Sequence, residues 1–430
     1  MKLLQHKPKN MESVKIRLIV MNFLQFFIWG SWLCTLGLYM TTPVEDGGLA
    51  FDGALVGSVF ALSGIASLIM PALIGVVSDK WVNAERLMGV LHWVGAISLF
   101  CAAFVTDYDL FKIAMLVNML AYMPTLSLSY TVAYNAIDKA GLDRIKDYPP
   151  VRVWGTIGFI VAMWIDNLTG FSSNNGQLIM AACASAAMGL YCFTLPACPP
   201  AKAMKNNGLM SVLGLDALVL FKNYRTAVFL LFSFLLGAAL QVTNMYGVPF
   251  LDSFKATHPE AWAVKYSVIL SSLSQVSETL FILAIPFFMS RYGIKRVMII
   301  SFMAWVLRFG FFAIGGPEGF PVVFLVLSMI VYGMAFDFFN VSGSLFIADE
   351  APASIKASAQ GIFMMMTNGL GSIVGGYGAG LVIAYHSENG VVTDWPACWT
   401  IFAAYACVIG ILFALTFHYK HQAKVKAEKV

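Results

Sequence analysis

The sequence predicts an all-α membrane protein with twelve transmembrane helices in two six-helix halves. Of its 430 residues, 59% are hydrophobic and only 12% are charged, and the mean hydropathy is +0.76. Soluble domains carry about 25% charged residues, so this composition excludes an ordinary soluble protein. The apolar blocks are long enough to cross a bilayer as helices. A transmembrane β-barrel would instead show strands of about ten residues with alternating polarity.

Six apolar blocks precede a hydrophilic stretch and six follow it. The stretch is too short to be a domain. It predicts a cytoplasmic linker at 199–223 between an N-terminal bundle at 1–198 and a C-terminal bundle at 224–430. The predicted spans are 17–41, 54–78, 87–106, 110–137, 150–171 and 177–197 in the first bundle, and 224–250, 266–290, 294–315, 321–347, 356–385 and 397–418 in the second.

The distribution of lysine and arginine predicts the orientation. If the N-terminus is cytoplasmic, nearly all of the 27 basic residues fall in cytoplasmic loops and tails. The exceptions are Lys112, Lys255 and Lys265 outside the membrane, and Arg152 and Arg308 within spans. Because cytoplasmic loops are enriched in these residues, we expect both termini in the cytoplasm.

The two halves share a charged turn at corresponding positions. The segments 75–86, after the second span, and 286–296, after the eighth, each combine a small residue with basic side chains. Two six-helix halves with a shared motif are typical of transporters that bind substrate between repeats. The spacing of Gly75, Asp79 and Lys80 also resembles the loop signature of the major facilitator superfamily. This resemblance implies the superfamily's fold.

Signals for catalysis and for bound cofactors are missing from the sequence. The seven cysteines form no CxxC pair and no ligand spacing with histidine, so they support neither a metal site nor a disulfide framework. We find no phosphate-binding loop and no nucleophile–base cluster. We therefore expect no enzyme activity, no cofactor, no metal and no nucleic-acid partner. A signalling receptor would be expected to carry a soluble signalling domain, and the sequence predicts none, so we do not expect a receptor.

Polar residues within the predicted spans lie at helical spacing on four helices. An ionisable residue at membrane depth is costly, which makes it a functional-site hypothesis. Residues three or four positions apart share one face of a helix. The predicted site residues are Arg152, Thr156 and Phe159 in span 5, Gln241 and Asn244 in span 7, Gln275 and Glu278 in span 8, and Tyr332, Phe336 and Asp337 in span 10.

This mixture of side chains suits a polar solute with several hydroxyl groups and a flat face. Charged side chains bind hydroxyl groups, amides supply donors and acceptors, and aromatic rings stack. A nucleoside, an aryl glycoside and a monosaccharide all remain open on chemistry alone. A single amide can equally hold two helices together, at about 0.6 kcal/mol per hydrogen bond.

Asp337 and Glu278 are the candidates for proton coupling. A carboxyl group whose partner changes between two conformations can take up and release a proton. Arg152 is a candidate partner in the other half, either in a structural ion pair or in a gate. The alternative for Asp337 is a carboxyl that only holds two helices together. Asp166 lies close to the predicted outer end of its span, so we expect it to be interfacial.

Longer motifs narrow the family. The segments Phe23 to Trp32, Ala121 to Leu126, Arg152 to Phe159, Gln275 to Phe281 and Tyr332 to Asn340 resemble the bacterial nucleoside:proton symporters, nearest to their nucleoside permease and xanthosine permease branch. The resemblance covers nearly the whole chain. It also implies that the helix bearing Arg308 is in the outer layer, where this side chain would snorkel or pair with a neighbour.

By this resemblance the chain is a nucleoside:proton symporter that works by alternating access. The ten residues predicted above would bind the nucleoside. We expect a multi-pass protein of the bacterial inner (plasma) membrane, surrounded by lipid and monomeric. The competing interpretation is a facilitator-superfamily carrier for another polar solute, such as a sugar or an aryl glycoside.

Overall fold

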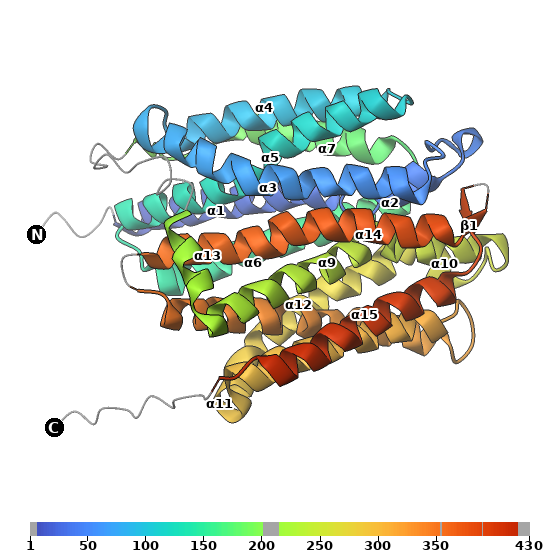
Figure 1. The fold of residues 1–430 in the computed structure, drawn as a ribbon. Helices are drawn as coiled ribbons and strands as arrows, with labels where there is room; N and C mark the ends of the chain where they lie inside the picture. Colours follow the sequence, from blue (N-terminus) through green and yellow to red (C-terminus); the bar gives the residue numbers. More distant parts are fainter. Residues whose placement is uncertain (1–6, 201–214, 353–354, 389, 420–430) are drawn as a thin grey trace, which may run out of the picture.

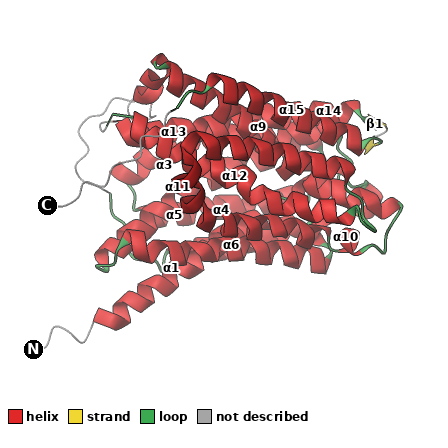
Figure 2. Cartoon of the chain, turned by 90° about the horizontal axis from the view of Figure 1, so that it is seen from below, coloured by secondary structure: helices red, strands yellow, loops and turns green. Residues whose placement is uncertain are grey.

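The computed structural model describes residues 7–200, 215–352, 355–388 and 390–419. Long helices run side by side through a single bundle (Figure 1). Helix α1 begins and helix α15 ends at the same end of this bundle, which we name the termini end; the opposite end is the far end (Figure 1). Figure 2 shows that helices make up nearly all of the described chain.

The first half contains seven α-helices. Asp52 and Asp107 begin two of them, because their carboxylates accept hydrogen bonds from the backbone N–H groups of Leu55 and Leu110. The elements are α1 (Lys7–Gly30), α2 (Leu36–Thr41), η1 (Val44–Asp46), α3 (Gly53–Lys80), α4 (Ala84–Ala103), α5 (Tyr108–Lys139), α6 (Arg144–Thr169), η2 (Phe171–Ser173) and α7 (Gly176–Cys192).

The second half ends in a helix that follows a short antiparallel hairpin of strands. In this hairpin Ser387 pairs with Val392. The elements are η3 (Leu215–Lys222), α9 (Tyr224–Ser253), η4 (Phe254–Ala256), α10 (Trp262–Lys265), α11 (Ser267–Ile314), α12 (Val322–Glu350), α13 (Lys356–Met364), the π-helical segment η6 (Met365–Gly371), α14 (Ser372–Tyr385), β1 (Ser387–Glu388), β2 (Val391–Val392) and α15 (Trp395–Thr416).

The helices account for all twelve predicted spans. Nine helices of the described chain are long and apolar enough to cross a membrane. Helix α11, with 48 residues, contains two of the spans, because the chain turns at Gly293 with a φ of 75°. The shorter α7 and the combined α13, η6 and α14 supply the other two.

Two spans predicted as continuous helices are irregular. The first is broken between α1 and α2, where Ser31 donates a side-chain hydrogen bond to the carbonyl of Phe27, at 2.8 Å. Such bonds offer backbone carbonyls an alternative to the helical ladder. The second is interrupted by η6, whose wider turn the hydropathy pattern does not reveal.

The two halves meet at the far end and separate toward the termini end. Helices α3 and α14 approach backbone to backbone, since a Cβ atom added to Gly376 would lie 2.8 Å from the carbonyl oxygen of Gly57. Nearer the termini end, no described atom lies within 4 Å of such a Cβ at Gly75 on α3 or at Gly361 on α13.

Polar contacts also join the halves at the far end. The Asn167 amide of α6 donates a hydrogen bond to the carbonyl of Lys265, at 2.9 Å, and accepts one from the backbone N–H of Val268, at 3.0 Å. It thereby satisfies backbone groups at the start of α11 from the other half. Trp164 of α6 donates its indole N–H to the hydroxyl of Ser272, at 2.9 Å.

Candidate functional site

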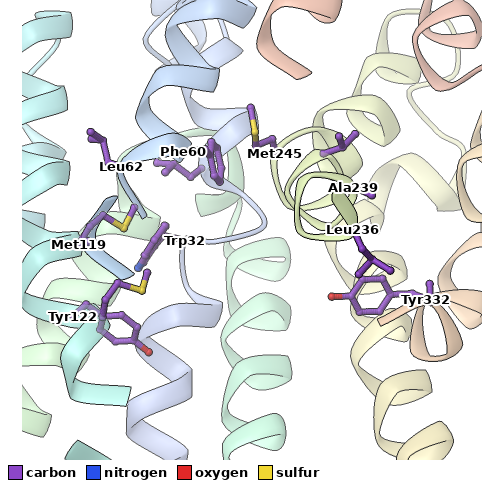
Figure 3. Packing of buried hydrophobic residues seen from close by; sticks show 14 of the residues in the cluster. Trp32, Phe60, Leu62, Met119, Tyr122, Leu236, Ala239, Met245 and Tyr332 are labelled. Carbon is purple, nitrogen blue, oxygen red and sulfur yellow. The ribbon is translucent and has the colours of Figure 1, made fainter. Parts of the chain in front are cut away.

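A stacked pair of aromatic rings lies on α12. Tyr332 and Phe336, one helical turn apart, have ring centroids separated by 6.0 Å and planes within 6° of parallel. Tyr332 is buried, and its hydroxyl end points away from its own helix (Figure 3). Leu236 lies beside the ring of Tyr332, and the buried side chains of Trp32 and Tyr122 in the N-terminal half lie apart from it (Figure 3). The ring pair offers a flat face for stacking.

Two carboxyl groups lie next to the ring pair. Asp337 is only 4% exposed, and its Oδ2 atom is buried without a hydrogen-bond partner. Glu278 of α11 is close enough for its charge to act on both Asp337 and Tyr332. A charged carboxylate that is buried without donors is costly, and two neighbouring carboxylates repel each other. The pair is therefore suited to binding a proton.

Arg152, on α6 in the N-terminal half, is a third charged residue of the candidate site. Its guanidinium lies 3.8 Å from the ring centroid of Phe26, and its Nε donates a long hydrogen bond of 3.5 Å to the hydroxyl of Tyr130. Its charge reaches Glu278. In the described residues, however, no ion pair joins Arg152 to Glu278 or to Asp337. The ion pair considered from the sequence is thus not formed in this conformation.

The remaining predicted residues differ in how they are held. Gln241 is buried, and its Nε2 donates to the carbonyl of Phe60 in the other half, at 3.5 Å. Phe159 is buried in a small apolar cluster. Thr156, Asn244 and Gln275 are partly buried, and within the described chain no polar side-chain atom of theirs is hydrogen-bonded. Their polar groups are therefore free to meet a ligand.

The structure connects some of the predicted residues more directly than others. Charge interactions link Arg152 to Glu278, and Glu278 to Asp337 and Tyr332. Phe336 joins this set through the ring stack. The other five predicted residues lie on α6, α9 and α11, three of the helices that bear the set or pack against it, but within the described chain no hydrogen bond, ion pair or ring contact joins them to it.

Arg308 is a part of this region that the sequence interpretation missed. Its side chain is only 1% exposed, so of the two expected positions it does not snorkel but pairs with neighbouring groups. Its Nη1 donates to the carbonyl of Ser328, at 2.8 Å, and to the hydroxyl of Ser274, at 3.3 Å. Its Nε donates to the hydroxyl of Thr243, at 3.3 Å.

Arg308 also supports the ring pair, because its guanidinium lies 4.5 Å from the ring centroid of Tyr332. Two of its partners, Thr243 and Ser274, directly precede the predicted site residues Asn244 and Gln275. The available signal was the charge itself, since an arginine in an apolar span needs a buried partner or a path to the interface.

Two further polar residues of the N-terminal half are buried. His92 is a packed histidine, as a lone histidine in a span suggests: its Nε2 lies 2.9 Å from the Gln25 Oε1, and its Nδ1 lies 3.3 Å from the Ser185 hydroxyl. Asp166 lies in the last turn of α6, which ends at Thr169, as its expected place close to the end of the span requires, and its side chain is 0% exposed.

No group of three or more histidine, cysteine or acidic side chains within the described chain is placed to hold a metal ion. The site thus consists of rings, carboxyl groups, guanidinium groups and amides. A family model described as nucleoside H+ symporter matches residues 11–422. The chain belongs to the nucleoside:proton symporter family.

Known members of the nucleoside:proton symporter family match over nearly their full length. The chain is 51% identical over 411 residues to the nucleoside permease NupG of Escherichia coli (strain K12), which covers 95% of this chain and 97% of that one. It is 50% identical over 422 residues to the xanthosine permease of the same organism, with 97% and 99% covered. A crystal structure of the nucleoside transporter NupG aligns with a TM-score of 0.88 at 51% identity, covering 95% of this chain and 100% of that chain.

Membership of the nucleoside:proton symporter family confirms the family resemblance seen in the sequence motifs. It also confirms the expected fold of twelve helices in the major facilitator superfamily, since the match to the NupG structure spans both halves. The chain is a multi-pass membrane transporter for nucleosides and not an enzyme.

Proposed function

We propose that this symporter takes up nucleosides together with protons through the site between its two halves. The observation that carries the site assignment is the position of Asp337, a buried carboxyl with an unpartnered oxygen next to the stacked rings of Tyr332 and Phe336. A substrate surface and a proton-binding group adjoin there. Coupling requires this proximity, because proton binding must change how the substrate is held.

Each predicted residue has a role in this proposal. The base stacks against Tyr332 and Phe336, and Phe159 supplies an apolar wall. Arg152 and Glu278 bind ribose hydroxyl groups with charge-assisted hydrogen bonds. The polar side chains of Thr156, Asn244 and Gln275 have no hydrogen-bond partner in the described chain. Together with the amide of Gln241, they contact the edges of the base or the ribose.

The conformation fits one state of an alternating-access cycle. The halves touch at the far end and diverge at the termini end. We assign the termini end to the cytoplasm, in agreement with the distribution of lysine and arginine. The structure then corresponds to a state open to the cytoplasm, in which the bundles 1–198 and 224–430 move around the linker 199–223. Most of that linker lies outside the described residues.

We assign proton coupling to Asp337 or Glu278. The charge of Arg152 attracts Glu278 across the two halves. A nucleoside that binds Arg152 competes with that interaction, so substrate and proton binding favour each other. We place the protein as a monomer in a bacterial inner membrane.

Uptake measurements in energised membrane vesicles test the proposal. We expect saturable uptake of radiolabelled uridine and inosine that a protonophore abolishes and that excess glucose does not reduce. Asp337→Asn should remove the uptake driven by a pH gradient. Asp109→Asn is the matched control, since Asp109 is exposed at the far end of α5. Full pH-driven uptake by Asp337→Asn would overturn the role of this residue, and no saturable uptake of either nucleoside would overturn the substrate class.

A further inference from the structure

Asp166 is a buried carboxyl outside the substrate site. It lies near the far end of α6 and is 0% exposed. Both of its carboxyl oxygens are buried, and neither has a hydrogen-bond partner in the described chain. A charged carboxylate without donors in such a place destabilises the protein by several kcal/mol. This is more than most single contacts contribute to its stability.

The polar groups near Asp166 use their donors elsewhere. The Thr35 hydroxyl, in the break between α1 and α2, is beside the carboxyl, yet it donates to the Gln177 Oε1 at 2.9 Å. The Gln177 Nε2 in turn donates to backbone carbonyls, among them that of Ser172 at 3.0 Å. While the single hydroxyl proton of Thr35 is donated to Gln177, a protonated Asp166 carboxyl can donate a hydrogen bond to the Thr35 oxygen, whereas a charged carboxylate needs Thr35 to turn its proton away from Gln177.

Few titratable groups face Asp166. The break between α1 and α2 contributes the Cys34 thiol, whose surroundings also include the charge of Arg308 on α11. The segment before α11 contributes the backbone carbonyl of Lys265, which binds Asn167. The charged and phenolic groups of α1 and α5 that contact α6 include Lys15, Tyr130 and Tyr134. They lie beside Asp147, Tyr148 and Arg152, and the nearest of these is roughly 20 Å along the helix from Asp166. Among the neutral polar residues, Gln177 of α7 accepts from Thr35 and donates to the carbonyl of Ser172 in η2, and Ser272 of α11 accepts from Trp164 of α6.

The closed far end covers this carboxyl. Cys34 belongs to an apolar cluster that combines residues of both halves, and Asn167, next to Asp166, binds the start of α11. If the halves separated at this end, the C-terminal members of the cluster would move away from Cys34 and water could reach Asp166. The cluster consists of Phe26, Cys34, Leu38, Phe159, Met163, Val248 and Val268.

We propose that Asp166 is a proton-binding site separate from the substrate site, filled from the far side of the membrane, whose bound proton stabilises the conformation closed at the far end. The sign follows from linkage: the closed form holds the neutral carboxyl, so proton loss favours the open form, in which water solvates the charge. The far end stays closed while the termini end is open. The proton therefore does not cross the membrane, and the ratio of protons to nucleosides is unchanged. The transport part of this inference rests on the proposed function.

Infrared difference spectroscopy tests the site without transport. At neutral pH, the purified protein should show a carboxylic-acid carbonyl band at the high-frequency end of the range, as expected for a carboxyl without strong donors, and Asp166→Asn should lack this band. Asp337→Asn should retain it. A spectrum in which Asp166→Asn removes only carboxylate bands would overturn the proposal. A band that responds to exchange of potassium for sodium would indicate a cation site and would also overturn it.

Uptake at fixed internal pH tests the consequence. As external pH rises, the wild-type rate should fall, because the far end closes less readily, whereas Asp166→Asn should retain a rate about threefold higher at alkaline external pH. Its proton-to-nucleoside ratio should equal that of the wild type. Identical pH profiles for the two proteins would overturn the proposal. If neither protein transports nucleosides, the proposed function fails and the infrared result still decides the proton site.

Discussion

The guanidinium of Arg308 lies 4.5 Å from the ring centroid of Tyr332 and binds the carbonyl of Ser328 on the same helix. Because Tyr332 stacks on Phe336, the buried guanidinium stabilises the position of both rings through its contact with Tyr332. The same guanidinium reaches α9 through Thr243 and the first part of α11 through Ser274. Arg308 thus joins the three helices that bear the C-terminal part of the proposed site.

Replacing Arg308 should weaken both folding and binding. Arg308→Met leaves the Ser328 carbonyl without its donor, at a cost of about 1–3 kcal/mol. We expect a lower thermal unfolding midpoint and a KM for uridine about tenfold higher. Arg308→Lys keeps the charge but lacks the planar fork, so it should restore part of the affinity. Equal KM values for the methionine and lysine variants would contradict a role for the charge.

The ring pair should contribute to substrate affinity. Phe336→Leu removes one member of the stack, and the loss of an aromatic contact of about 0.5–1.5 kcal/mol corresponds to a KM roughly three- to tenfold higher. The maximal rate should change less than KM. Phe320→Leu is the control, since Phe320 is 73% exposed. An unchanged KM in Phe336→Leu would remove this ring from the binding site.

Closing of the far end should depend on the contact between α3 and α14. In Gly376→Val, the added Cβ meets the Gly57 carbonyl oxygen at 2.8 Å, so the helices are held apart and uptake should fall by about tenfold or more. Gly378→Val makes the same substitution on the same helix, where no described atom lies within 4 Å. Its uptake should stay close to that of the wild type. Similar losses in both variants would point to helix propensity as the cause.

The Asn167 amide should stabilise the start of α11 from the other half. Asn167→Ala leaves the backbone N–H groups of Val268 and Ile269 without their acceptor, and the loss of a helix cap costs about 1 kcal/mol. Amide hydrogen exchange should accelerate at 265–270. Thr169→Ala, which removes a bond only within α6, should leave this exchange unchanged. Protection that persists in Asn167→Ala would show that α11 is held by other contacts.

Apolar length and charge distribution were sufficient to predict the helices from the sequence. All twelve spans correspond to helices, because hydrophobic length is a strong requirement for crossing a bilayer. The depth of individual polar side chains was harder to predict. The sequence left open whether Arg308 snorkels or pairs with a neighbour, and it placed Asp166 near the end of its span without showing that the side chain is buried. Lipid tails and a protein core are equally apolar, so hydropathy does not distinguish a helix face directed outward from one directed inward.

Spacing predicted the shared faces of the candidate site within each helix, but not the contacts between helices. Arg152 and Glu278 come from different halves, so spacing along either helix does not set the distance between them. The break at 31–35 and the segment η6 were missed for a related reason: a wider or broken turn leaves hydrophobicity unchanged. Hydrogen bonding decides these features.

The segment η6 sets the directions in which the side chains of α14, the second part of the eleventh span, point. A π-helical turn accommodates one residue more than an α-helical turn, so the two parts of this span are offset by about 100° relative to a continuous α-helix. This offset lets Gly376 face α3 while Gly375 faces Ala238 of α9. Deleting one residue within 365–371 would rotate α14 back and turn both glycines away from their partners. Chain length is therefore as tightly constrained here as residue type.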